Sequence, residues 1–334
     1  MADKAFGTFE GKRVDHFTLT SETGVELDFI TFGAAIRDWR VPVKGGLRTV
    51  VLGFDTLQPY VDYTQHFGAL AGRVANRIAK ASFEIEGKRY DLPANWKSHT
   101  LHGGPGGLGR LVWEAERDTT GNRIRFRHVS PDGDMGFPGR VEFTATYTLT
   151  GNRVRLDLAA TTDAVTPISV VQHHYFNLGS TDTVLDHSYH ATGVQYTEVD
   201  AELIPTGRLL PVDGTQWDLR QSRTMRDASG APVDYDGNVV LDPQRDPTNP
   251  AAVVTGEDGA LTLRLWTDRP GLQVYNSVMT PDGLIGLNGK RYGKYTGFCL
   301  EDQDFPDAVH HENFPSIWYG PGRDYSHWCE IEIA

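Results

Sequence analysis

The sequence has few cysteines, no long apolar run and a shortage of basic residues, and each shortage excludes a class of protein. Its two cysteines, Cys299 and Cys329, are too few for a disulfide framework or a four-thiolate zinc site. No stretch approaches the roughly 18 apolar residues that a membrane-spanning helix needs. Lys and Arg number 32 against 44 Asp and Glu, and the resulting net charge of −12 disfavours nucleic acid and anionic membranes as partners.

The N-terminal segment also lacks the continuous apolar stretch of a signal peptide. Residues 1–18 mix lysine, aspartate and glutamate among their apolar residues. Together with the small number of cysteines, this favours a cytoplasmic protein whose thiols stay reduced.

A helical apolar period is missing as well, and strand-like alternation takes its place. Residues 83–92 predict a hairpin, and residues 56–61 a short helical turn. The 36 glycines and 18 prolines supply many turns. We therefore expect an all-β protein with two large antiparallel sheets packed face to face. Apolar and polar residues alternate most clearly at residues 24–30, 141–148, 154–159 and 261–266.

No shift in composition marks a boundary between domains. The polar segment 221–250 is the best candidate for a linker, but residues 235–241 within it resemble a turn that enters a strand. A length of 334 residues suits one large all-β domain, so we predict a single domain over residues 1–334.

Polar rings are concentrated at residues 171–178, which read Val-Gln-His-His-Tyr-Phe-Asn-Leu. Strand-like residues lead directly into His173 and His174, so this pair is expected on a strand or at its end. A rigid support of this kind is what a preorganised site needs. For each histidine taken alone, a structural role is the alternative.

Other segments carry chemically equipped side chains, and each alone also fits an ordinary structural role. The arginine and asparagine within residues 72–78 suit contacts to vicinal hydroxyls, or a surface ion pair. Glycines after His102 allow a ligand or the backbone to come close. Gln273 is an amide inside a strand-like run. Glu301 follows an apolar run, where burial would tune a general base, unless it only caps a turn.

Taken in order, these motifs resemble the aldose 1-epimerase (galactose mutarotase) family over almost the whole chain. The resemblance implies a β-supersandwich with an open cleft on one sheet, and an isomerase that needs no metal and no organic cofactor. The run of two histidines and a glutamate at residues 310–312 falls in the family's polar loop, so no metal site is predicted there. The matching segments are residues 33–35, 51–55, 72–78, 101–104, 136–139, 173–178, 235–236, 300–303, 305–308, 320–322 and Tyr325.

The resemblance also implies roles for particular residues. The residue that protonates the sugar ring oxygen falls on His173, and the catalytic base falls on Glu301. We expect Tyr175, close behind His173, to line the cleft. The family's sugar-binding positions fall on Asn76, Arg77, His102, Asp236 and Gln273.

The interconversion of α and β anomers of a free aldose, such as galactose or glucose, calls for such a pair of groups. One group removes the proton of the anomeric hydroxyl while the other protonates the ring oxygen. The ring opens, the aldehyde turns about its C1–C2 bond, and the ring recloses. An ionised Glu301 is expected to raise the pKa of His173 and keep it charged. His102 is expected to help stabilise charge at the ring oxygen.

Three positions depart from the family's usual pattern. Gln172 stands in place of asparagine, His174 in place of a small hydroxyl residue, and Gly237 in place of a histidine that often follows the binding aspartate. The longer amide is expected to change how His173 is oriented, and Gly237 to remove a possible sugar contact. These changes concern the choice of sugar more than the reaction.

Three other functions stay open on the sequence. A glycoside hydrolase would use Glu301 with Asp236 as paired carboxylates, which leaves His173 and His102 without a role. A sugar-binding or sensor protein would use the cleft without turnover, and a hexose 6-phosphate 1-epimerase would need an added basic cluster. The preferred aldose, the choice between monomer and homodimer, and whether Cys299 lines the cleft or the core also stay open.

Overall fold

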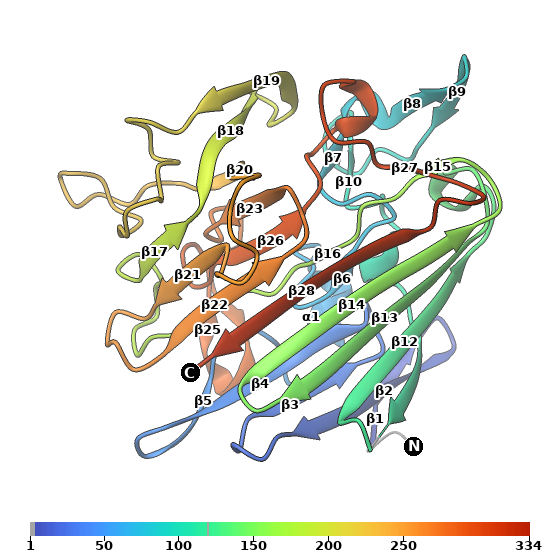
Figure 1. The fold of residues 1–334 in the computed structure, drawn as a ribbon. Coiled ribbons are helices and arrows are strands. Elements are labelled where there is room, and N and C mark those ends of the chain that lie inside the picture. Colours follow the sequence, from blue (N-terminus) through green and yellow to red (C-terminus); the bar gives the residue numbers. More distant parts are fainter. Residues whose placement is uncertain (1–3, 119) are drawn as a thin grey trace.

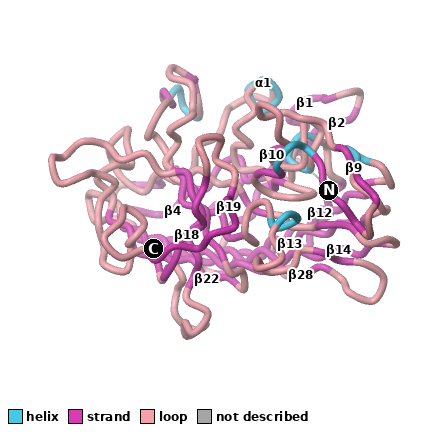
Figure 2. The backbone as a smooth tube through the Cα atoms, turned by 90° about the horizontal axis from the view of Figure 1, so that it is seen from above, coloured by secondary structure: helices cyan, strands magenta, loops and turns pink. Residues whose placement is uncertain are grey.

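The computed structural model describes residues 4–118 and 120–334 of the chain. Three antiparallel sheets of five, eight and five strands make up most of the described fold, together with five two-stranded sheets (Figure 1). Helix is confined to a few short segments among long loops (Figure 2). The prediction of an all-β protein with large antiparallel sheets is confirmed.

The N-terminal sheet follows the chain order, because each strand pairs with the next through a short connection. Its strands are β1 Lys4–Phe9, β2 Lys12–Thr20, β3 Glu26–Ile30, β4 Ala35–Val43 and β5 Gly46–Thr49.

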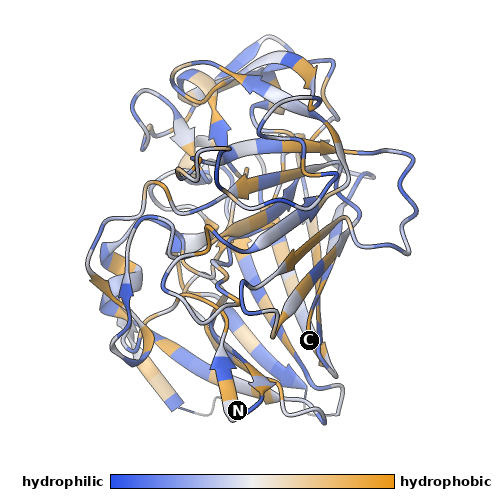
Figure 3. Ribbon diagram, turned by 90° about the vertical axis from the view of Figure 1, so that its left-hand side faces the viewer, coloured by the Kyte–Doolittle hydropathy of each residue, from blue (hydrophilic) through white to orange (hydrophobic). Residues whose placement is uncertain are grey.

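The eight-stranded sheet has the order β11-β12-β13-β14-β28-β22-β21-β17, so the C-terminal strand lies in its middle (Figure 1). Apolar and polar residues alternate along the long strands β13 and β14, which gives this sheet one buried face (Figure 3). The strands are β11 Glu114–Asp118, β12 Arg123–Ser130, β13 Val141–Thr150, β14 Arg153–Thr162, β17 Ser188–Ala191, β21 Ala252–Thr255, β22 Thr262–Thr267 and β28 Tyr325–Ile333.

The two sheets pack face to face, as predicted. Phe29 of β3 lies against Phe126 of β12 and Tyr147 of β13, with ring centroids 6.0 and 5.1 Å apart. All three rings belong to one large apolar cluster. Aromatic contacts of this kind contribute beyond the area they bury.

The third large sheet has the order β19-β18-β20-β23-β26, and Asp236 and Glu301 lie on two of its strands. Its strands are β18 Gly193–Val199, β19 Pro205–Pro211, β20 Asp236–Leu241, β23 Gly271–Tyr275 and β26 Cys299–Gln303. The two-stranded sheets pair β6 Leu70–Ala71 with β16 Val171–Gln172, β7 Arg77–Ile78 with β10 Thr100–Leu101, β8 Ser82–Ile85 with β9 Lys88–Asp91, β15 Thr166–Pro167 with β27 Trp318–Tyr319, and β24 Leu284–Ile285 with β25 Arg291–Tyr292.

The local predictions agree with these elements. The hairpin expected at residues 83–92 is β8 and β9, and the turn expected at residues 56–61 is α1 Gln58–Asp62. The short 3-10 helices are η1 Ala79–Ala81, η2 Leu108–Arg110, η3 Asp134–Gly136, η4 Leu287–Gly289 and η5 Ala308–His310.

The polar segment 221–250 contains β20, which lies inside the third sheet. The single domain over residues 1–334 stays a prediction. None of the helices in the described residues has the length and apolar character to span a bilayer.

The core of the eight-stranded sheet should dominate stability. Leu156 of β14 is 2% exposed, whereas Leu47 of β5 is 47% exposed. Leu156→Ala should lower the free energy of unfolding by about 2–5 kcal/mol, because it leaves a cavity in a packed core. Leu47→Ala, the matched control, should change it by less than about 0.5 kcal/mol. Urea denaturation measures both, and equal effects would contradict this packing.

Candidate active site

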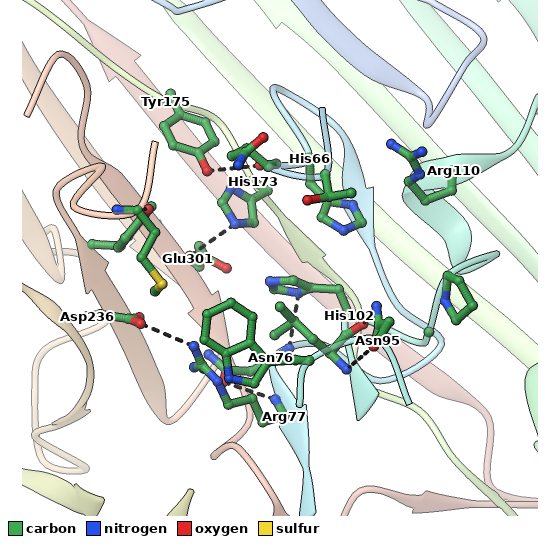
Figure 4. Close-up of a pocket in the computed structure, with 18 residues that line it drawn as sticks. His66, Asn76, Arg77, Asn95, His102, Arg110, His173, Tyr175, Asp236 and Glu301 are labelled. Carbon is green, nitrogen blue, oxygen red and sulfur yellow. Dashed lines mark hydrogen bonds and ion pairs between the residues drawn. The ribbon is translucent and has the colours of Figure 1, made fainter. Parts of the chain in front are cut away.

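A cavity of about 250 Å³ opens beside the third sheet, and residues from distant parts of the chain line it (Figure 4). The loop before β6 contributes His66, and the segment at β7 contributes Asn76 and Arg77. The loop after β10 contributes His102, and the segment after β16 contributes His173 and Tyr175. Asp236 comes from β20 and Glu301 from β26. The fold thus brings together seven of the eight residues predicted for the site.

The two predicted catalytic side chains face each other. His173 directly follows β16, and its Nε2 lies 3.6 Å from Oε1 of Glu301, as the dashed line in Figure 4 marks. His173 is 5% exposed and Glu301 is 2% exposed. The other carboxyl oxygen, Oε2, is buried and has no hydrogen-bond partner. This unpaired acceptor is free to bind a hydroxyl of a ligand.

The strand that precedes His173 is fastened to the strand that carries Glu301. Gln172 Nε2 donates to the carbonyl of Leu300 at 2.6 Å and to Oδ1 of Asp302 at 3.2 Å. Its Oε1 accepts the backbone N–H of His174 at 3.2 Å. Gln172 therefore links the backbone next to Glu301 with the backbone next to His173.

The ring of His173 is supported from behind. Its Nδ1 lies 3.6 Å from Sγ of Cys299, a buried residue of the core, so Cys299 belongs to the core and is not among the residues that line the cleft. Tyr175 stacks on the imidazole with ring centroids 5.0 Å apart. The hydroxyl of Tyr175 donates to the carbonyl of Gln65 at 2.9 Å. Tyr175 thus lines the cleft and at the same time holds the imidazole in place.

The expected direction of the pKa of His173 is wrong in this cleft. Burial lowers the pKa of His173 to about 4. Burial, with Asp236 nearby, raises the pKa of Glu301 well above its usual range. Burial removes the hydration of each charged form, and the attraction across a contact of 3.6 Å does not compensate for this desolvation. Both shifts favour the uncharged forms, a protonated Glu301 beside a neutral His173.

His102 presents a hydrogen-bond donor to the cleft. Its Nδ1 accepts the backbone N–H of Asn76 at 3.2 Å, so the proton of the neutral ring lies on Nε2. Burial lowers the pKa of His102 well below its usual value, which keeps the ring neutral. The Nε2–H group can donate to a sugar oxygen.

The same tautomer disfavours a metal ion. One ligand atom each from His102, His173 and Glu301 lie within 4.8 Å of one another, a spacing that a metal could draw together. A metal needs a free lone pair on Nε2 of His102, and the second nitrogen of a metal-bound histidine normally donates to an acceptor. Here that nitrogen faces the N–H of Asn76, which is itself a donor.

Asp236 is held by two neighbours, one at each of its carboxyl oxygens. Gln273 Nε2 donates to Oδ1 at 2.6 Å, and Arg77 forms an ion pair with Oδ2 at 3.3 Å. Asn76 Oδ1 accepts from Arg77 at 3.2 Å, and the guanidinium lies over the ring of Trp96. Gln273 is not among the residues that line the cavity, and it contacts the cleft through Asp236.

Comparison with known proteins identifies the family. The sequence model described as aldose 1-epimerase matches residues 15–332. The chain belongs to the aldose 1-epimerase family. The predicted family and the predicted isomerase class are therefore confirmed.

Similar members of the aldose 1-epimerase family cover nearly the whole chain. Galactose mutarotase of Rattus norvegicus is 37% identical over 332 residues, which are 97% of this chain and 96% of that protein. Aldose 1-epimerase of Haemophilus influenzae is 33% identical over 343 residues, which are 98% of both proteins. The crystal structure of an aldose epimerase homologue from C. elegans has a TM-score of 0.90 at 27% identity, over 96% of this chain and 99% of that one.

Two departures from the aldose 1-epimerase pattern concern the core rather than the cleft. His174 is 2% exposed and lies near Tyr147 and Phe176, with ring centroids 6.5 and 5.9 Å away. A Cβ at Gly237 would lie 2.4 Å from the ring of Trp217. Trp217 fills the space beside Gly237 in this fold, and the loss of a sugar contact at Gly237 stays a prediction.

His66 and Arg110 are among the cleft residues that sequence reasoning missed. Arg110 donates to the carbonyls of Tyr60, Val61 and Tyr63. Its guanidinium therefore fixes the end of α1 beside the cleft. His66 lies in a loop without alternation, and its only signal is its closeness to the motif at residues 72–78.

Buried neutral histidines should make this protein sensitive to acid. Burial lowers the pKa values of His66 and His174 to about 3 and those of His173 and His187 to about 4, and His102 is lowered as well. Below the unfolded pKa of about 6.5, the unfolded chain binds protons at these histidines and the folded protein does not. The free energy of unfolding therefore decreases as the pH is lowered. Glu301, Asp304 and His310, whose pKa values are raised, act in the opposite sense. They number three, against six histidines with lowered pKa values once His128 is included.

Each histidine should lower the free energy of unfolding by up to about 1.4 kcal/mol per pH unit below about pH 6.5. Urea denaturation between about pH 7 and about pH 5 measures the slope. A flat stability curve over that range would contradict the burial of uncharged rings.

Proposed function

We propose that the protein interconverts the α and β anomers of a free aldose through one proton shared by Glu301 and His173. The observation that carries the proposal is their contact at 3.6 Å inside a cleft lined by hydrogen-bonding groups. An acid and a base that face each other can act on two neighbouring atoms of one sugar, the anomeric hydroxyl and the ring oxygen.

The shared proton explains how a buried pair can act as acid and base. Transfer from Glu301 to His173 turns the neutral pair into a carboxylate and an imidazolium without changing the number of protons. A bound anomeric hydroxyl can donate to the unpaired Oε2 of Glu301 and thereby stabilise the carboxylate. Glu301 then removes the hydroxyl proton, His173 protonates the ring oxygen, and ring closure reverses both transfers. Each positioned group contributes roughly 10²–10⁴-fold.

The remaining residues of the cleft would position the sugar. The Nε2–H of His102 would stabilise charge at the ring oxygen, since its proton is fixed by the contact with Asn76. Arg77 and Asp236, which form an ion pair, would bind sugar hydroxyls. Gln273 would keep Asp236 in position through its hydrogen bond to Oδ1. Asn76 and Tyr175 would complete the cleft wall, and no cofactor takes part.

Two observations disfavour the other enzyme classes. A glycosidase that used Glu301 with Asp236 as its paired carboxylates would leave His173, whose Nε2 lies 3.6 Å from Glu301, and His102 without a role. Among the described residues, the cations that line the cleft are Arg77 and Arg110, and Arg110 is committed to backbone carbonyls. A phosphate group would therefore find no free basic cluster. A cytoplasmic location suits the net charge of −12 and forms part of this proposal.

Polarimetry on freshly dissolved α-galactose, α-glucose and maltose tests the reaction. The protein should speed relaxation to the same final rotation, and Glu301→Gln or His173→Asn should each remove most of the acceleration. Glu312→Gln, at an exposed position, is the matched control and should keep the wild-type rate. Near-full activity in either site variant would refute the assigned roles. No acceleration of any sugar would favour a binding protein.

The pH profile provides an independent check on the shared proton. Because the pKa of His173 is lowered to about 4, the pair should keep its single proton well below pH 6.5, the usual value for histidine. The acid limb of kcat/KM should therefore lie near pH 4 rather than near 6.5. Rates are compared only at pH values where circular dichroism shows a folded protein. An acid limb near 6.5 would mean that a solvated histidine controls catalysis.

A further inference from the structure

A third histidine ring lies in the cleft beside the two that the mechanism uses. The centroid of His66 lies 4.9 Å from that of His102 and 6.1 Å from that of His173. Figure 4 shows the ring across the cleft from Glu301, between His173 and Arg110. His66 lines the cavity and is only 7% exposed. It is thus close enough to the reacting groups to touch a bound sugar.

The loop that carries His66 is fixed to the catalytic segment. The backbone N–H of Gly68 donates to the carbonyl of His173 at 3.0 Å, and the N–H of His173 donates to the carbonyl of Ala69 at 2.9 Å. His66 itself has a φ of +54°, a left-handed conformation in which residues other than glycine are uncommon. Strained residues of this kind gather at functional sites. Glycine would relieve the strain here but would remove the ring.

The two ring nitrogens of His66 have different surroundings. Nδ1 is buried without a hydrogen-bond partner, and a Cβ at Gly109 would lie 2.5 Å from it, so this edge packs against backbone. A buried N–H without an acceptor is rarer than an unfilled lone pair, which favours the proton on Nε2. Burial, with His173 and Arg110 nearby, lowers the pKa of His66 to about 3 and keeps the ring neutral. The ring can then offer one N–H donor to a ligand.

We propose that His66 is a further substrate-binding residue, whose Nε2–H donates a hydrogen bond to one hydroxyl oxygen of the bound aldose. The inference rests on the proposed function and adds a specificity contact to it. Sugars that present this hydroxyl in the other configuration would leave the donor unpaired in a buried site, which disfavours them. His66 thereby discriminates among aldoses, while Glu301 and His173 carry the reaction.

The test pairs variants of His66 with galactoses that each lack one hydroxyl. His66→Phe keeps an aromatic ring but removes the hydrogen-bond donor. His66→Asn shortens the side chain so that its amide cannot reach the sugar, and asparagine is compatible with the left-handed backbone. Both should lower kcat/KM for galactose about tenfold, mainly through KM, and His66→Gln should restore most of the loss. On one deoxygalactose, wild type and His66→Phe should be equally active, because the contact is already missing. An equal loss on every deoxygalactose would overturn the proposal.

Failure of this inference can be told from failure of the proposed function. Wild-type acceleration of galactose mutarotation is measured first and tests the function alone. If it is absent, calorimetric titration of galactose into wild type and His66→Phe still tests the contact. Equal affinities would then overturn the role of His66. Urea denaturation shows whether His66→Phe or His66→Asn is misfolded. If one of them is, the folded variant alone is used to judge the role of His66.

Discussion

The contact between Glu301 and His173 is the interaction on which the rest of the site depends, and it joins two different strands. His173 directly follows β16, Glu301 lies in β26, and Gln172 binds the backbone of β26 on one side and that of His174 on the other. Asp302 accepts a hydrogen bond from Gln172 and pairs with a fully buried His327 at 2.6 Å. A buried network whose members are all satisfied rigidifies its surroundings, so the pair is preorganised before a ligand binds.

Burial gives this contact its chemical character. A charged pair loses hydration when it is buried, so the empty cleft favours a neutral acid beside a neutral imidazole. The tautomer with a carboxylate and an imidazolium holds the same number of protons and becomes favourable once polar groups of a ligand surround it. His102, with its proton fixed on Nε2 by Asn76, adds a donor without adding charge. Three uncharged imidazoles can therefore share one small cavity.

Much of this arrangement is predictable from the sequence. The features that were not predicted depend on which groups the fold buries together. Alternation located the long strands, and the polar run placed His173 at a strand end, where the structure has it. The direction of the pKa of His173 was wrong, because the sequence shows a carboxylate partner but not the loss of solvent around both groups. His66 was missed because backbone hydrogen bonds to His173, distant in sequence, bring its loop into the cleft. The packing of Trp217 against Gly237 could not be predicted either, because these residues come together only in the fold.

Infrared difference spectroscopy shows directly whether Glu301 and His173 share one proton. The spectrum of the wild type minus that of Glu301→Gln, recorded at neutral pH without sugar, isolates the absorption of one carboxyl group. If the proton is shared, the spectrum should show the C=O stretch of a protonated Glu301. This band should diminish when a saturating aldose occupies the cleft. A carboxylate signal in the empty protein, unchanged by sugar, would contradict the account, since Glu301 and His173 would then not share one proton.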